Sequence, residues 1–352
     1  MLQNVQIAMF QGVEYSVSSF TISDGIFGTC FYFGTGLIGA PISNNTNKIS
    51  NKIEENTKLS PDWITGFSDA ESAFLIKIGE DTTRKFNLRI ISEFVIELHQ
   101  RDFEVLKEIK NFFNVGSLRL RVRKGKTTGI YSVQSIKDLT EVIIPHFQKY
   151  PLITQKQADF NLFSSVVELI KNKRHLDEEG LKEIISLRAS MNKGLSGILK
   201  IMFPEIKPVE RLVISSQEIK SPFWLLGFVD GEGCFYIKIR NNKQVALVFS
   251  ITQHSSPCCA GGRDLGLMNV IKNYLDCGII EQVSTRPTIV NFVVYKFNDN
   301  YTKILPFFEK YSLVTQKNKD FIKFSEIASI IEKKQHLTIE GINKIISTAS
   351  QG

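Results

Sequence analysis

The chain has 352 residues, of which 43% are hydrophobic, and a formal net charge of +7 with a pI near 9.0. This length allows about two domains, and no run approaches the roughly 20 apolar residues of a membrane helix. Five scattered cysteines form no C-x-x-C pair and no zinc spacing, which favours a reduced intracellular compartment. The basic charge favours an anionic partner, most simply nucleic acid.

The first 58 residues differ in composition from the rest of the chain. Residues 1–41 contain no Lys or Arg, whereas residues 42–58 are rich in Asn, Lys and Thr and almost free of large apolar side chains. The second composition cannot bury enough surface to fold alone. We therefore predict a leader over residues 1–41, separate from the folded protein, and a flexible linker over residues 42–58.

The remainder contains an internal duplication. Residues 63–78 read WITGFSDAESAFLIKI and residues 224–239 read WLLGFVDGEGCFYIKI. One separation, 161 residues (224 − 63), relates five pairs: Trp63 and Trp224, Glu71 and Glu232, Tyr150 and Tyr311, His175 and His336, Gly180 and Gly341. A fixed period indicates repeated structural units. We predict one repeat over residues 59–190, a connector over 191–220 and a second repeat over 221–349.

Both repeats predict the same order of elements. Each begins with a helix that has a proline at its first position, after Ser60 and Ser221. Strands then follow over 74–78 and 85–98 in the first repeat, matched by 235–239 and 244–253. A helix (103–113; 265–275) precedes two further strands (within 116–133; 278–296), and closing helices begin at the N-caps Asp177 and Thr338. The fold class is α+β, with two pseudo-symmetric αββαββα repeats.

The first helix of each repeat carries small residues four positions apart, Gly66 with Ala70 and Gly227 with Gly231. Such residues share one helix face and let two helices approach closely. Glu71 and Glu232 follow directly, so close packing would bring both carboxylates to one end of the pair. Two adjacent carboxylates repel unless they share a positive charge, and Mg²⁺ suits oxygen ligands. The alternative, two ordinary amphipathic helices with solvated acids, explains the paired spacing less well.

The motifs GFVDGEG and GFSDAES resemble the LAGLIDADG motif of homing endonucleases. The two-copy arrangement resembles the single-chain form encoded in fungal mitochondrial group I introns. The resemblance covers residues 59–349, including YPLITQK, YSLVTQK and the central FPEI. It implies a monomeric, site-specific double-strand DNA endonuclease of the mitochondrial matrix that promotes intron mobility. Mg²⁺ would be its cofactor, with Mn²⁺ or Ca²⁺ able to replace it in binding, and it would have no small-molecule substrate and no stable membrane association.

The resemblance also implies site residues. Glu71 and Glu232 would bind the divalent metal, and Gln253 and Lys296 match family positions that line the active site. The first repeat has Leu98 and Ser135 at the corresponding positions, which predicts an asymmetric site. We interpret Asp69 and Asp230, two residues before each glutamate, as supporting groups rather than ligands.

Alternating charge in the strands predicts a nucleic-acid surface. Arg119, Arg121 and Arg123 share one face of a strand whose other face is apolar (Leu118, Leu120, Val122). A solvated outer face is the alternative. A ten-residue strand spans about 33 Å, or about 10 bp, so two repeats would cover about 20 bp. The predicted DNA-binding set is completed by Lys77, Arg84, Lys85, Arg89, Tyr236, Lys238 and Arg240.

Two segments depart from the repeat pattern. SPCCAGG (256–262) interrupts the second repeat and is typical of a loop. EYSVSSFTISDGIFGTCFYFGTGL (14–37) resembles part of cytochrome c oxidase subunit three, which indicates an upstream exon and a DNA target near the codons for Thr35, Gly36 and Leu37. Two further functions remain open: an RNA maturase that assists its own intron, and a DNA-binding module without catalysis.

Overall fold

The computed structural model describes residues 59–214, 218–240, 244–254, 265–283 and 286–350. The predicted leader, the linker and the SPCCAGG segment lie outside these ranges. Among the helices within them, none is long and apolar enough to cross a membrane.

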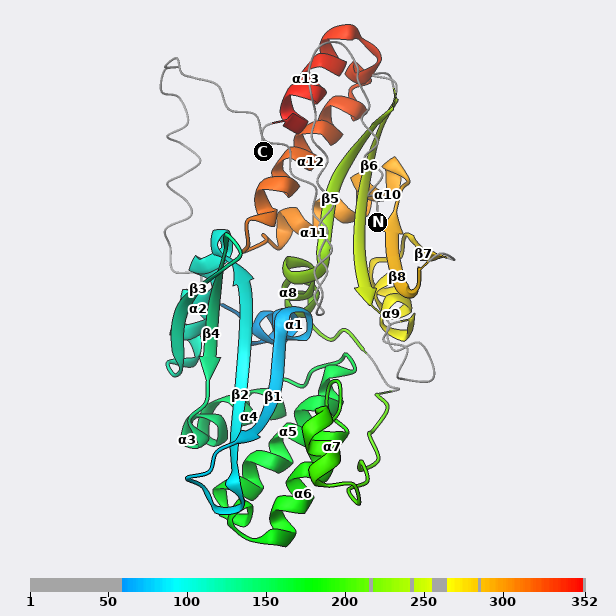
Figure 1. Cartoon of the computed structure of the whole chain (residues 1–352). Helices are drawn as coiled ribbons and strands as arrows, with labels where there is room; N and C mark the ends of the chain where they lie inside the picture. Colours follow the sequence, from blue (N-terminus) through cyan, green and yellow to red (C-terminus); the bar gives the residue numbers. More distant parts are fainter. Residues whose placement is uncertain (1–58, 215–217, 241–243, 255–264, 284–285, 351–352) are drawn as a thin grey trace, which may run out of the picture. The chain divides into compact units, whose positions relative to one another are not determined.

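The described residues form two repeats with the same order of elements (Figure 1). The first contains α1 (Pro61–Glu71), β1 (Ser72–Glu80), β2 (Leu88–His99), α2 (Phe103–Phe113), β3 (Ser117–Arg123), β4 (Lys126–Val133), α3 (Ile136–Asp138), α4 (Ile144–Lys149), α5 (Lys156–Lys171) and α6 (Glu178–Ala189). After α7 (Gly197–Met202), the second contains α8 (Pro222–Glu232), β5 (Gly233–Arg240), β6 (Gln244–His254), α9 (Leu265–Leu275), β7 (Ile279–Val283), β8 (Arg286–Val294), α10 (Phe297–Asp299), α11 (Leu305–Lys310), α12 (Lys317–Glu332) and α13 (Ile339–Ser350). Short 3₁₀ and π segments join them: η2 (Lys85–Asn87), η3 (Gln100–Asp102), η4 (Leu139–Ile143), η5 (Arg174–Leu176), η6 (Asn300–Ile304) and η7 (Gln335–Leu337). The predicted α+β class and αββαββα order are confirmed.

Each repeat builds one four-stranded antiparallel sheet, in the order β1-β2-β4-β3 and β5-β6-β8-β7. Phe74 pairs with Phe94, and Phe94 with Val133, so these side chains share the face that helices cover. Phe235, Phe249 and Val294 repeat this arrangement. Because side chains alternate along a strand, the residues between them lie on the opposite, outer face.

Phenylalanines fill the space between each sheet and its helices. The ring of Phe74 lies 5.2–5.4 Å from four others: Phe94, Phe147, Phe160 and Phe163. The ring of Phe235 lies 4.9–5.5 Å from the equivalent four: Phe249, Phe308, Phe321 and Phe324. Aromatic pairs at these separations stabilise a core beyond their buried area. The matched clusters occupy equivalent positions in the two repeats, and both belong to one continuous hydrophobic core.

Helices α1 and α8 pack against each other through the predicted small residues. A methyl group added to Gly66 would overlap the carbonyl oxygen of Trp224, and one added to Gly227 would overlap that of Trp63. One added to Gly231 would meet the methyl group of Ala70. Only small side chains permit this approach, which joins the two repeats along their motif helices.

Two local predictions can be compared directly with the structure. The caps are confirmed, because the side chains of Asp177 and Thr338 accept hydrogen bonds from the Gly180 and Gly341 amides. The apolar reverse of β3 is covered only at Leu118, whereas Leu120 and Val122 are exposed. β3 is an edge strand, and its distal end extends past the core-facing helix α2.

Candidate active site

The motif glutamates end the two packed helices, Glu71 as the last residue of α1 and Glu232 as the last of α8. The Glu71 side chain lies beside Gly231, with its Cγ 3.1 Å from the position of a methyl group there. Burial, followed by repulsion from Glu232, raises the pKa of Glu71 to about 7. The close approach of the helices thus holds two mutually repelling carboxylates at one end of the pair.

Two lysines reach the same helix ends, Lys156 as the first residue of α5 and Lys317 as the first residue of α12. The Nζ of Lys156 donates to the carbonyl oxygens of Ser68 and Ala70, at 2.8 and 3.3 Å. The Nζ of Lys317 donates equivalently to Val229, at 3.3 Å, and to Gly231. These carbonyls belong to the helix C-termini, where unpaired acceptors and the helix dipole favour a cation.

Both lysines also act on the carboxylates electrostatically. Their charges lower the pKa of Glu71 and partly oppose the effects of burial and Glu232. Burial in turn lowers the pKa of Lys156. Sequence reasoning used YPLITQK and YSLVTQK only to define the repeat and missed these lysines as site residues. The signal that could have found them was a lysine at the same position in both copies.

Asp69 and Asp230 hold the loops that lead directly into these lysines. Asp69 accepts from the Ile153 amide (3.0 Å), the Thr154 amide (3.3 Å) and the Thr154 hydroxyl (2.5 Å). Asp230 accepts from the Val314 amide (3.0 Å), the Thr315 amide (2.9 Å) and the Thr315 hydroxyl (2.7 Å), a second matching set. Both carboxylates are buried, so these donors replace the water that the acids lose on folding.

The predicted basic residues of the first sheet fall mostly on its outer face. Arg119 pairs with Ile130 on β4, and Ile130 pairs in turn with Glu97 on β2. Arg121 pairs with Thr128 on β4 and lies on the same face as Arg119. By the same alternation Lys77, Arg89 and Arg123 share this face. Arg84 and Lys85 lie in the turn between β1 and β2, and Lys85 donates to the Leu176 carbonyl at 2.6 Å.

Three of these cations have acidic partners, and the pair in the turn joins Arg84 to Asp81 at 3.6 Å. Lys77 pairs with Glu93, whose side chain is 1% exposed and also accepts from Gln134 at 2.6 Å. Arg121 pairs with Glu97 at 2.6 Å. In the second sheet, Val248 occupies the position that matches Glu93, and Thr252 occupies the position that matches Glu97.

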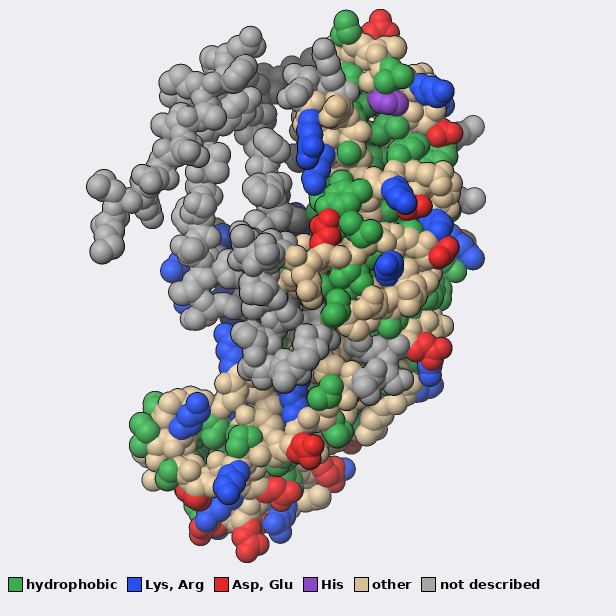
Figure 2. Space-filling view, turned by 90° about the vertical axis from the view of Figure 1, so that its right-hand side faces the viewer, with side chains coloured by type: hydrophobic (Ala, Val, Ile, Leu, Met, Phe, Trp, Pro, Cys, Tyr) green, Lys and Arg blue, Asp and Glu red, His purple; other side chains and the backbone are tan. Residues whose placement is uncertain are grey.

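The outer face of the second sheet carries Tyr236, Lys238 and Arg240. There the Nζ of Lys238 lies over the rings of Tyr236 and Tyr295, 5.5 and 5.1 Å from their centroids, as in cation–π contacts. Figure 2 views the molecule from the right-hand side of Figure 1, and on this side basic side chains are mixed with acidic and hydrophobic ones.

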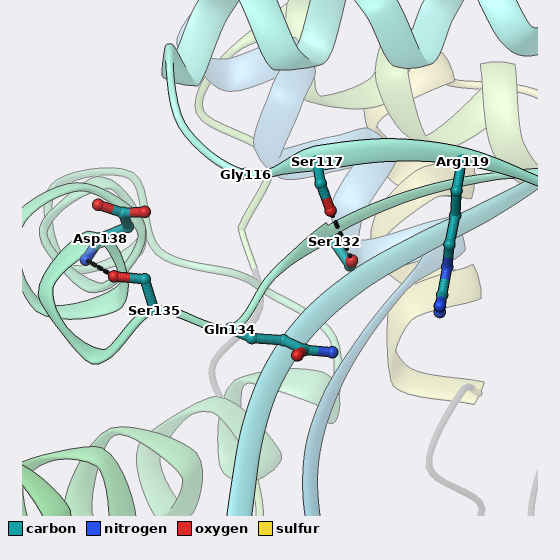
Figure 3. Close-up of a pocket in the computed structure, with 7 residues that line it drawn as sticks. All are labelled: Gly116, Ser117, Arg119, Ser132, Gln134, Ser135 and Asp138. Atoms are coloured by element: carbon teal, nitrogen blue, oxygen red, sulfur yellow. Dashed lines mark hydrogen bonds between the residues drawn. The ribbon is translucent and has the colours of Figure 1, made fainter.

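An open hollow of about 360 Å³ lies where β3 begins and β4 ends (Figure 3). Its lining is polar, with Arg119 at one side, and the Ser117 and Ser132 hydroxyls lie 3.5 Å apart. Ser135 accepts from the Asp138 amide at 3.3 Å. The hollow continues the outer face of the sheet and does not include the glutamates.

The structure places Gln253 and Lys296 in different surroundings. Gln253 pairs with Val290 near the end of β6, on the side of the sheet that Phe249 and Ile251 share. Lys296 is exposed and precedes α10. Leu98 and Gln253 hold matching positions on β2 and β6, as expected. A role for Gln253 or Lys296 in catalysis stays a prediction.

A family model described as LAGLIDADG endonuclease matches residues 64–167 and 225–328, once in each repeat. The chain belongs to the LAGLIDADG endonuclease family. A model of cytochrome c oxidase subunit III matches residues 1–50. The subunit 3 protein of Pyricularia grisea is 90% identical over 30 residues, 8% of this chain and 11% of that protein. Both predicted resemblances are therefore confirmed.

Relatives of this LAGLIDADG protein include two from Neurospora crassa. Probable intron-encoded endonuclease 2 is 37% identical over 319 residues, which are 86% of this chain and 68% of that protein. Probable intron-encoded endonuclease 3 is 36% identical over 291 residues, 80% and 52% of the two chains. The chain thus spans about two thirds and about half of these relatives.

Two solved structures share the fold. I-SmaMI, bound to an uncleaved DNA target in the presence of calcium ions, superposes with a TM-score of 0.77 and 38% identity. The match covers 83% of this chain and 98% of that one. The homing endonuclease I-GzeII, in complex with its DNA target, gives a TM-score of 0.77 and 38% identity, covering 84% and 98%.

Proposed function

We propose that this chain is a site-specific endonuclease that hydrolyses one phosphodiester bond in each strand of a DNA duplex. The carboxylate pair at the joined ends of α1 and α8 carries the proposal. The DNA complexes of I-SmaMI and I-GzeII support it, because they share this fold at 38% identity. Maturase activity has no comparable observation in its favour.

The residues at the helix ends fit a hard divalent cation. Glu71 and Glu232 supply carboxylate oxygens, the donors that Mg²⁺ prefers, and their mutual repulsion favours a shared positive charge. Mg²⁺ is the proposed cofactor, with Mn²⁺ or Ca²⁺ able to take its place in binding. When bound, it would lower the pKa of a water molecule and stabilise negative charge on the phosphate and the leaving oxygen.

The chain's own residues have separate tasks in this proposal. Glu71 and Glu232 hold the metal, while Lys156 and Lys317 keep the helix ends in place and add positive charge where the phosphates would lie. Gln253 and Lys296 remain proposed catalytic residues of the second repeat. If they act, the two strands would be cut at unequal rates, because Leu98 and Ser135 occupy the matching positions.

Recognition would use the outer faces of the two sheets. A β-ribbon fits the major groove, where arginine pairs with guanine, and two sheets would cover about 20 bp. The protein would act as a monomer, since both catalytic halves lie in one chain. The subunit III match over residues 1–50 supports synthesis in the mitochondrion from a reading frame continuous with an exon. The target would then be the uninterrupted exon junction, and cutting would promote intron mobility.

The test is cleavage of a linear duplex that covers the uninterrupted subunit-three coding sequence around the codons for Thr35, Gly36 and Leu37. The full chain is compared with Glu71→Gln and Glu232→Gln, in Mg²⁺ and in a chelator. We expect one cut site, lost in both variants and in the chelator. Tight binding without cutting would contradict the catalytic proposal. Preferential binding of the intron transcript would instead favour the maturase function.

A further inference from the structure

The buried aspartates receive one hydrogen bond each from the opposite repeat. The indole Nε1 of Trp63 donates to Oδ2 of Asp230 at 2.8 Å. The indole Nε1 of Trp224 donates to Oδ2 of Asp69 at 2.9 Å. Both bonds are buried, so they are stronger than equivalent bonds in water. They link residues 167 and 155 positions apart.

The two tryptophans have little freedom to move. Trp63 stacks on Phe67 with ring centroids 4.7 Å apart, and Trp224 stacks on Phe228 at 5.0 Å. Their carbonyl groups lie against Gly227 and Gly66 at the helix contact. Each indole N–H is therefore a fixed donor whose position depends on the packing of α1 against α8.

Each aspartate is linked to the lysine of its own repeat by hydrogen bonds through a threonine. Thr154 donates its hydroxyl to Asp69, and the same oxygen accepts from the Lys156 amide at 3.1 Å. In the other repeat, Thr315 donates to Asp230 and accepts from the Lys317 amide at 3.3 Å. The lysine Nζ atoms then close each network on the carbonyls at the ends of α1 and α8.

We propose that Asp69 and Asp230 are positioning residues for the two active-site lysines, and that the tryptophan of the opposite repeat fixes each aspartate. This inference rests on the proposed function for its catalytic part. The arrangement crosses between the repeats. Trp224 and Asp69 position Lys156, whereas Trp63 and Asp230 position Lys317. Substitution of a tryptophan in one repeat therefore acts on the loop before the lysine of the other, whereas substitution of an aspartate acts within its own repeat.

The substitutions that test the crossing remove single hydrogen-bonding groups. Trp63→Phe and Trp224→Phe each delete one N–H donor and retain an aromatic ring. Asp69→Asn and Asp230→Asn keep the size of the side chain but place an amide among several donors, which leaves some of them unpaired. A buried residue of α13, in Ile345→Val, is the control for a general loss of stability.

The first measurement is amide hydrogen exchange in the full chain, and it needs no cleavage. We expect Trp63→Phe to speed exchange at Val314 and Thr315 and to leave Ile153 and Thr154 unchanged. Trp224→Phe should give the reverse pattern. Faster exchange in the loop of the substituted tryptophan's own repeat, or equal change in both loops, would overturn the crossed arrangement.

The second measurement follows the nicking of each strand of the target duplex separately. We expect Trp63→Phe and Asp230→Asn to slow the same strand about tenfold, as the loss of a bond to a charged group predicts. Trp224→Phe and Asp69→Asn should slow the other strand, and Ile345→Val neither. Equal slowing of both strands would overturn the positioning role. If the unsubstituted protein cuts no duplex, the proposed function fails, while the exchange pattern still decides the crossing.

Discussion

The contact between α1 and α8 predicts an energetic coupling between Gly231 and Ala70. In Gly231→Ala, the new methyl carbon would lie 2.3 Å from the Ala70 methyl carbon, whereas ordinary contact begins at 3.4 Å. The helices must therefore separate locally by about 1.1 Å (3.4 − 2.3). Overpacking of this kind costs about 1–3 kcal/mol, and alanine returns at most about 1 kcal/mol of helix propensity. We expect a net loss of about 1–2 kcal/mol in the free energy of unfolding.

Removing the Ala70 methyl group should restore the fit. Ala70→Gly alone should cost about 1 kcal/mol. Combined with Gly231→Ala, it exchanges the two residues across the interface and removes the overlap with Ala70. The tightest contact left to the new methyl group is then the one to Cγ of Glu71, at 3.1 Å. The double variant should then lie within about 1 kcal/mol of the original protein, a coupling expected only between residues in contact.

Urea unfolding of the four proteins measures this coupling directly. Gly79→Ala is the matched control, because a methyl group there meets nothing within 4 Å, and it should change stability by less than about 0.5 kcal/mol. Strictly additive losses in the double variant would refute the reasoning, since the two methyl groups would then not oppose each other. A destabilised Gly79→Ala would show that the method responds to any added methyl group.

Three further predictions concern charge. The pKa of Glu71 is raised to about 7, so the folded protein without metal keeps a proton that the unfolded chain loses above pH 4.5. The free energy of unfolding should therefore fall by at most about 3 kcal/mol between pH 4.5 and 7. In urea titrations at a series of pH values, Glu71→Gln should flatten this dependence. Lys317→Met removes a charge that lowers the Glu71 pKa, so half-maximal cleavage should require a higher pH, and an unchanged pH–rate profile would contradict this. Arg119→Ala should reduce the slope of log affinity against log salt by about 0.9, and Arg121→Ala by less, because Glu97 already pairs with Arg121.

Sequence patterns were sufficient for the parts of the fold that depend on local order. The ranges 103–113 and 265–275 match α2 and α9, because both segments have helical periodicity and clear ends. The duplication also helped. Two small residues four positions apart occur in many helices and indicate little in a single copy, but their recurrence before a glutamate in both repeats indicated a helix contact. The caps Asp177 and Thr338 followed from side-chain chemistry alone.

Contacts over long sequence separations could not be predicted in this way. Lys156 lies 85 residues beyond Glu71 (156 − 71), and it reaches the end of α1 only because the loop before α5 returns to that helix. Sequence patterns included Lys77 in the predicted DNA-binding set but could not show that Glu93 pairs with it. Nor could they show that Lys85 turns to the Leu176 carbonyl. The pairing of strands and loops decides which charges remain available to a ligand.

The same helix contact that joins the repeats also creates the repulsion at the site. Gly66, Gly227 and Gly231 let the backbones meet, and that closeness holds Glu71 near Glu232. Burial and then this neighbouring charge raise the pKa of Glu71. A wider contact would lessen the repulsion, but it would also separate the two carboxylates that are proposed to share a cation. Folding without metal is therefore less favourable than it could be, and a bound divalent cation would recover the difference. Stability and the proposed chemistry are linked through the small residues of two helices.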